Sequence, residues 1–211
     1  MSTASRTHAW NRRGHYYVGL YLLVFLWFFS ISGLILNHSS WSVAQFWKAR
    51  RESVVERAFV VPTTSSDVGI ASDVMRQLGI EGEIGEIKRS PDGSVVEMQV
   101  VKPGHVYRIA ARLDSAHASI TTIALNGWGA LDALHKFTGV RMDEPTQTRD
   151  WILTRIWSLA MDALALGLIA LVLSGVYLWL RLKGRRAVGM VSLVLGVVSC
   201  AWFLLGLGAR M

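Results

Sequence analysis

The sequence contains a single cysteine, Cys200, which lies in its last apolar stretch. One cysteine excludes an intramolecular disulfide, and the chain has no CxxC pair and no Cys/His spacing typical of zinc sites. The sequence motifs GxSxG, the phosphate-binding loop and HExxH are also absent. Nothing in these patterns points to hydrolysis, and any catalysis would depend on a bound redox cofactor.

Charge is almost missing from three long stretches of the chain. Val18 to Leu36 alone is 19 residues without a charge. This run is longer than the apolar core of a signal peptide, about 7–15 residues, so we interpret it as an uncleaved anchor. About 20 apolar residues cross a hydrocarbon core as a helix. We therefore predict three transmembrane helices, at residues 14–38, 151–181 and 187–208.

Basic residues gather at the ends of these predicted helices. Seven of the 22 lysines and arginines lie there, the pattern of cytoplasmic helix ends. These basic helix ends explain the formal net charge of +7. We therefore expect a lipid bilayer as the partner of the chain, and no nucleic acid. Residues 1–13 and 182–186 are then cytoplasmic, whereas residues 39–150 and the C-terminus lie outside. The seven are Arg6, Arg12, Arg13, Arg181, Lys183, Arg185 and Arg186.

Residues 39–150 carry the pattern of a small α+β domain. Apolar residues at helical spacing predict a helix over residues 64–78, capped by the sequence Ser-Ser-Asp and ended by Gly79. Alternating apolar and polar residues predict strands, most clearly at 95–101 and 106–113. We expect a helix, an antiparallel meander of three or four strands, and a short helix at 128–137. Turn residues separate the strands at Ser90–Gly93, Lys102–Gly104 and Asp114–His117.

Small residues recur at helical spacing in the second and third predicted membrane helices. Each set forms one stripe along its helix, and such a stripe lets another backbone approach closely. Because only a short turn joins the two helices, the stripes predict a closely packed antiparallel hairpin. The residues are Ala160, Ala163, Gly167, Ala170 and Ser174, then Gly189, Ser192, Gly196, Ser199 and Gly206.

Four short motifs, in this order, resemble the PepSY-associated transmembrane helix proteins. They are GHYYVG at 14–19, SGLILNH at 32–38, LHKFTG at 134–139 and LSGVYLW at 173–179. The segment between the second and third motifs is similar to a PepSY domain. The resemblance implies a multi-pass protein of the bacterial inner membrane with its soluble domain in the periplasm.

The family also implies several functions. Its larger members include siderophore-associated reductases of iron uptake, in which membrane histidines bind haem b. PepSY domains elsewhere act as peptidase inhibitors or modulators. This chain departs from those reductases in being shorter, with three predicted helices and one soluble insertion, so the resemblance does not carry a complete transmembrane electron path over to it.

Two of the six histidines are candidate axial ligands of a haem iron. His38 and His135 lie at the same predicted membrane surface and match the family motifs, and neutral imidazoles are common axial ligands. Asp132, one turn before His135, is a candidate to orient its ring. The alternative is that both histidines bond to helix ends at the interface. His15 is 23 residues from His38, roughly 34 Å along a helix, and lacks a histidine partner unless a homodimer brings two copies together.

Asp162 is the only acid within the second predicted membrane helix. An intramembrane carboxylate is costly, so it suggests either a functional role or an internal partner. We expect it to face the first helix and to form a clasp with Asn37, His38 or Arg155. A proton-transfer or ligand-orienting role is the alternative.

Three functional hypotheses remain open. The first is a non-enzymatic inner-membrane protein whose periplasmic domain binds a protein partner or a ligand. The second is a haem b electron-transfer component of periplasmic, siderophore-linked iron reduction, which would make the chain an oxidoreductase component. The third is modulation of a peptidase. No metal site is expected beyond haem iron.

Overall fold

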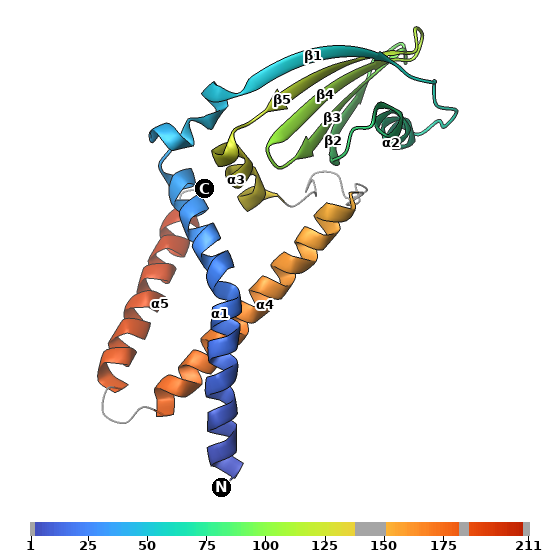
Figure 1. Ribbon diagram of the computed structural model, residues 1–211. Coiled ribbons are helices and arrows are strands. Elements are labelled where there is room, and N and C mark those ends of the chain that lie inside the picture. The colour runs from blue at the N-terminus through green and yellow to red at the C-terminus, as the bar shows by residue number, and fades with distance from the viewer. Residues whose placement is uncertain (1–2, 138–150, 182–185, 209–211) are drawn as a thin grey trace. The chain divides into compact units, whose positions relative to one another are not determined.

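The computed structural model contains five α-helices and a five-stranded antiparallel sheet within the residues that it describes (Figure 1). Two predicted regions lie outside the described residues. One is the end of the soluble domain, residues 138–150, which includes the end of the LHKFTG motif; the other is the turn at 182–185. The described residues are 3–137, 151–181 and 186–208.

The chain divides into two compact units. Unit 1 comprises residues 1–25 and 163–211, and it contains helical segments and no strand among its described residues. Unit 2 comprises residues 26–162 and contains the sheet.

Three helices are long and apolar enough to cross a membrane, which confirms that part of the prediction. They are α1 (Thr3–Asn37), α4 (Ile152–Arg181) and α5 (Arg186–Gly208). The helix α1 begins at Thr3 and not at residue 14. Polar residues can continue the helical hydrogen bonds in water, so apolar content marks the spanning part of a helix and not its end.

Within unit 1, the small residues of α4 face α1. A methyl group added at Gly167 would lie 3.2 Å from Leu22, which is fully buried. By contrast, an added methyl at Gly196 or Gly206 of α5 would meet no described atom within 4 Å. The predicted close packing of the hairpin is therefore wrong at Gly196 and Gly206, whereas Gly189, the first residue of the α5 stripe, lies directly against Trp179 of α4. A small stripe permits close approach, but it does not select which helix approaches.

The sheet of unit 2 has the strand order β1-β5-β4-β3-β2, and every neighbouring pair is antiparallel. Strands β2 to β5 form the predicted meander of consecutive neighbours. The strands are β1 (Arg51–Ala58), β2 (Glu83–Arg89), β3 (Val95–Lys102), β4 (His105–Arg112) and β5 (His117–Ala124).

Strand β1 was not predicted. Its sequence, RESVVERA, places two valines side by side between charged residues and so lacks the alternation of a half-buried strand. It forms by pairing with β5, with Arg51 opposite Ala124 and Ala58 opposite His117. A pairing partner this distant in sequence cannot be identified from local pattern.

The helix α2 (Asp67–Leu78) covers one face of the sheet, as Figure 1 shows. Its ends agree with the predicted caps: the Ser66 hydroxyl accepts the Gly69 N–H at 3.1 Å, and Gly79 adopts a left-handed φ of 67°. Burial of the helix's apolar face against the strands forms the core. Buried core residues include Ile70, Val74, Leu78, Val96, Val100, Ile109 and Ile120.

The helix α3 (Gly127–Lys136) packs on the segment before β1. This segment contains two short 3₁₀ turns, η1 (Ser42–Ala44) and η2 (Phe46–Ala49), and α3 contacts both. A methyl group added at Gly129 would lie 2.9 Å from Phe46, so only glycine allows this approach.

Candidate functional site

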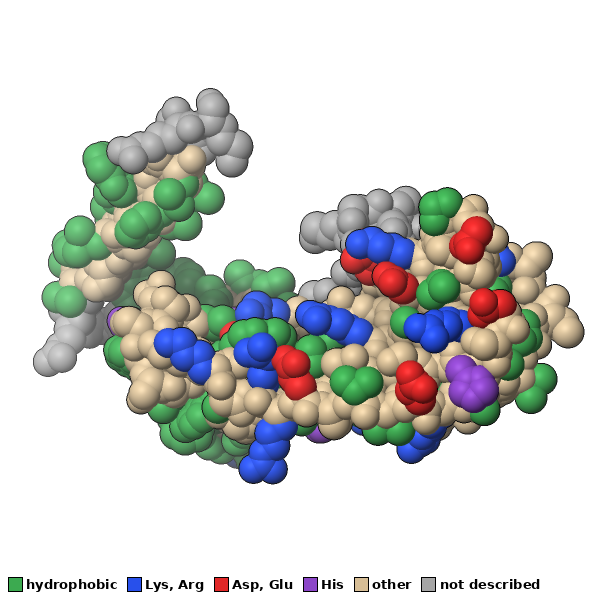
Figure 2. All heavy atoms as spheres, turned by 90° about the horizontal axis from the view of Figure 1, so that it is seen from above, with side chains coloured by type: hydrophobic (Ala, Val, Ile, Leu, Met, Phe, Trp, Pro, Cys, Tyr) green, Lys and Arg blue, Asp and Glu red, His purple; other side chains and the backbone are tan. Residues whose placement is uncertain are grey.

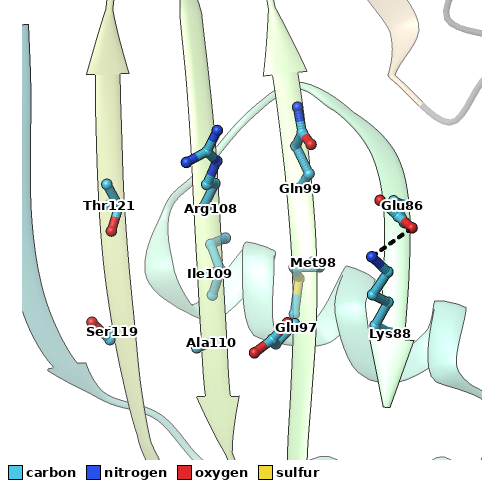
Figure 3. Close-up of a pocket in the computed structure, with 10 residues that line it drawn as sticks. All are labelled: Glu86, Lys88, Glu97, Met98, Gln99, Arg108, Ile109, Ala110, Ser119 and Thr121. Carbon is cyan, nitrogen blue, oxygen red and sulfur yellow. Dashed lines mark ion pairs between the residues drawn. The ribbon is translucent and has the colours of Figure 1, made fainter. Parts of the chain in front are cut away.

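The face of the sheet opposite α2 is open and hollowed. Strand alternation sends the core side chains Met98 and Ile109 toward α2 and leaves polar side chains on the other face. Figure 3 looks onto this face, with α2 behind the strands. The hollow has a volume of about 290 Å³. It is lined by Glu86, Lys88, Glu97, Met98, Gln99, Arg108, Ile109, Ala110, Ser119 and Thr121.

The strand register explains the depth of the hollow. Ala110 of β4 pairs with Glu97 of β3 on one side and with Ser119 of β5 on the other. This row of residues across the strands therefore has small side chains at its centre. In the next row Arg108 lies between Gln99 and Thr121. The small side chains therefore form the floor of the hollow, and the longer side chains around them form its walls.

The hollow offers hydrogen-bond donors and acceptors together. The Arg108 guanidinium and the Glu97 carboxylate have no ion-pair partner among the described residues, whereas Glu86 and Lys88 pair at 3.0 Å on the β2 side (Figure 3). A guanidinium binds carboxylates through two parallel hydrogen bonds. Gln99 and the hydroxyls of Ser119 and Thr121 add neutral donors and acceptors. The arrangement suits a ligand that carries both signs of charge, such as a peptide segment.

The edge strand β1 is exposed along its whole length. Val54 and Val55, which point to opposite faces, are 64% and 48% exposed. An edge strand carries unpaired backbone N–H and C=O groups that can pair with another strand. The charged residues of β1 limit such pairing without excluding it; they are Arg51, Glu52, Glu56 and Arg57.

His135 lies against α1 within unit 2. The Ser32 hydroxyl donates to the Phe28 carbonyl at 2.8 Å, and Ser32 Oγ lies 2.6 Å from His135 Nδ1. A hydroxyl has one proton, so His135 Nδ1 carries a proton and donates to Ser32. The ring also packs edge-on against Phe29. In the neutral imidazole, Nε2 is then left with a lone pair.

His38 has different neighbours. Its Nδ1 donates to the Leu34 carbonyl of its own helix at 2.9 Å, and its ring stacks on Trp41 with centroids 4.4 Å apart. The donor chemistry of both rings suits axial ligation, since each neutral ring keeps Nε2 as an acceptor. However, His38 is six residues beyond Ser32, about 9 Å along the helix, so the two rings contact different levels of α1. Haem ligation by this pair stays a prediction.

Among the described residues, the two predicted carboxylates make no hydrogen bond or ion pair with these rings. Asp132 pairs with Lys136 at 3.0 Å, one turn further along α3, and His135 Nδ1 bonds to Ser32 instead. Asp162 is exposed on α4 and makes no hydrogen bond or ion pair with a described residue. Among the described residues there is no group of three or more His, Cys, Asp or Glu side chains that would hold a metal ion.

His15 has a partner that sequence reasoning missed. Ser174 donates to the Leu171 carbonyl at 2.9 Å, so His15 Nδ1 donates to Ser174 Oγ at 2.8 Å. Asn11 adds a bond to the Ser174 carbonyl at 3.3 Å. The available signal was Ser174 itself, the one hydroxyl in the small stripe of the second helix.

Comparisons with protein-family models, curated proteins and solved structures find no match to this chain. The resemblance of its four motifs therefore stays a prediction.

Proposed function

We propose that this chain is a multi-pass membrane protein that presents a binding domain on the non-cytoplasmic side of a bacterial inner membrane. Three apolar helices anchor it, and the open face of the sheet binds an extended segment of a partner protein. The observation that carries the binding role is the polar hollow opposite α2, where Arg108 and Glu97 on neighbouring strands have no ion-pair partner among the described residues.

The composition of the two units supports the membrane orientation. Every acid of the chain lies within residues 26–162, the range of unit 2. Red and blue side chains stand side by side in Figure 2, and every red one belongs to unit 2. A mixed-charge surface suits an aqueous compartment, whereas basic helix ends are retained in the cytoplasm.

The partner is a peptide segment because of what the hollow and the edge strand offer together. The hollow supplies a guanidinium, a carboxylate, an amide and hydroxyls for side chains and for a terminal carboxylate. The exposed strand β1 supplies backbone groups, by which extended peptides add to sheets. A peptidase is one partner class that the resemblance implies.

The test is site-specific photo-crosslinking in intact cells that express the full chain. We expect a crosslinker at Ala110, on the floor of the hollow, to capture a partner protein. The matched control is a crosslinker at Arg76 on α2, whose side chain is 80% exposed. Adding Arg108→Glu should abolish the product at Ala110. A product that survives this charge reversal, or that forms equally at Arg76, would rule out the hollow as the binding site.

Haem binding is the second candidate, favoured by hydrogen bonds that leave Nε2 of His38 and His135 unprotonated in the neutral rings. Protein purified in detergent after expression with sufficient haem should then show reduced α and β bands. Each of His38→Ala and His135→Ala should abolish them, and His117→Ala, at the exposed start of β5, should not. A colourless folded protein would eliminate this candidate.

A further inference from the structure

Unit 1 has charge of one sign only. Its sequence, residues 1–25 and 163–211, contains eight lysines and arginines and no aspartate or glutamate. No internal carboxylate can therefore neutralise its cations. The eight are Arg6, Arg12, Arg13, Arg181, Lys183, Arg185, Arg186 and Arg210.

Two of these arginines line a hollow between α1 and the end of α4, inside unit 1. Its volume is about 470 Å³. Arg12 and Arg181 come from the two different helices and give it two guanidinium groups. Tyr16 and Leu178 line it further toward the apolar part of each helix. The full lining is His8, Arg12, Tyr16, Leu178 and Arg181.

One lining residue, His8, has a buried ring nitrogen. Nδ1 of His8 is inaccessible to solvent and makes no hydrogen bond among the described residues. The His8 ring lies near Tyr177, with centroids 6.4 Å apart. The Arg181 guanidinium lies over the same Tyr177 ring, 5.3 Å from its centroid, which orients it without neutralising it. Two guanidinium groups thus share one hollow without a carboxylate partner among the described residues.

The chemistry that satisfies these groups is a phosphate ester attached to an apolar tail. Guanidinium groups bind phosphate oxygens through paired hydrogen bonds. Tyrosine and leucine suit the boundary between headgroup and acyl chain. Basic hollows between membrane helices on the cytoplasmic side are suited to anionic headgroups.

We propose that this hollow binds the phosphate of an anionic phospholipid, with Arg12 and Arg181 as its principal contacts. The assignment rests on the membrane location proposed above. It adds a specific lipid site on the cytoplasmic side to the binding domain on the other side.

The test is lipid retention by the full chain in detergent, measured by native mass spectrometry with phosphatidylglycerol and phosphatidylcholine of identical acyl chains. Wild-type protein should retain phosphatidylglycerol preferentially. The double variant Arg12→Gln/Arg181→Gln should lose about twenty-five-fold in affinity, since each cation contributes roughly a factor of five. Arg12→Gln alone should lose about fivefold. Glutamine and arginine have similar helix propensities, so the helices should persist, as circular dichroism would verify.

The matched control is Arg13→Gln/Arg186→Gln, which removes the same charge outside the hollow. Equal losses in both double variants would mean diffuse attraction and would overturn the site. Competition by millimolar inorganic phosphate as effective as that of the lipid would assign the hollow to free phosphate instead. Membrane fractionation with carbonate washing separates the two proposals: a membrane-resident protein without lipid preference refutes only this site, whereas a carbonate-soluble one refutes the membrane location.

Discussion

The two units of this chain are stabilised in different ways. Unit 2 buries a continuous apolar core between α2 and the sheet, and its acids and bases are mixed. Unit 1 buries few of its described side chains, contains no acid, and brings α1 and α4 together through glycine contacts and one Ser–His bond. The hydrophobic effect in water explains the stability of unit 2, whereas close packing and hydrogen bonds between apolar helices explain the stability of unit 1. Four predictions test this contrast.

The largest effect is expected in the core of unit 2. Ile109→Ala removes a side chain that is 2% exposed, and it should lower the free energy of unfolding of the sheet domain by about 2–5 kcal/mol. Leu173→Ala in unit 1 removes a side chain that is 65% exposed and should change little. Hydrogen exchange of strand amides in the full chain would measure the loss of stability in each of the two variants. Similar losses would contradict a core confined to unit 2.

The next effect should come from close helix packing in unit 1. Gly167→Leu forces a side chain against Leu22, and overpacking of this kind costs about 1–3 kcal/mol. Gly196→Leu is the matched control, because a methyl group there meets no described atom within 4 Å. The temperature of thermal unfolding in detergent should be lowered by Gly167→Leu only. If Gly196→Leu is the more harmful, α5 packs closely at Gly196 after all.

The Ser–His bonds should contribute less. Ser174→Ala removes the acceptor of His15 Nδ1 and should cost roughly 0.6–1 kcal/mol, as hydrogen bonds between membrane helices do. Ser192→Ala is the control, since among the described residues that hydroxyl bonds only to Val188 of its own helix.

The same bond recurs in unit 2 between Ser32 and His135. Nitrogen-15 NMR of the neutral histidines should show protonated Nδ1 in His15 and His135. Ser174→Ala and Ser32→Ala should each alter only the spectrum of the histidine that they contact. An Nε2-protonated ring in the wild type would refute the assigned hydrogen-bond direction.

The smallest effect concerns the exposed turn between β2 and β3. The hydroxyls of Ser90 and Ser94 and the Ser94 N–H donate to the Asp92 carboxylate and lower its pKa from 3.8 to about 2. Because the folded pKa is the lower one, the stabilisation is complete only above about pH 5 and is lost as the pH falls through 4 toward 2. NMR titration of the Ser94 amide should follow this pKa. Asp92→Ala should abolish the transition, and a midpoint near 4 in the wild type would contradict the bonds.

Local patterns predicted much of unit 2. Ser66 and Gly79 are capping residues by chemistry alone, and the structure confirms both. The turn at Ser90–Gly93 separates β2 from β3 as expected. The polar hollow was not predicted, because it requires knowing which residues of four strands lie opposite one another.

The histidines show where prediction stops. Sequence reasoning looked for histidine partners, whereas two of these histidines donate to serines on another helix, Ser174 for His15 and Ser32 for His135. A serine in an apolar helix has no pattern that reveals its partner, because its hydroxyl can always bond to its own helix.

By itself the sequence determined three long apolar helices, a capped amphipathic helix and a β-meander, because burial periodicity, capping and turn chemistry act between residues close in the chain. Only the tertiary structure decided that β1 pairs with β5, that the small face of α4 contacts α1, and that Arg12 and Arg181 share one hollow. Those contacts join distant residues, and many partners of equal local suitability compete for each. The choice among them depends on packing of the whole chain.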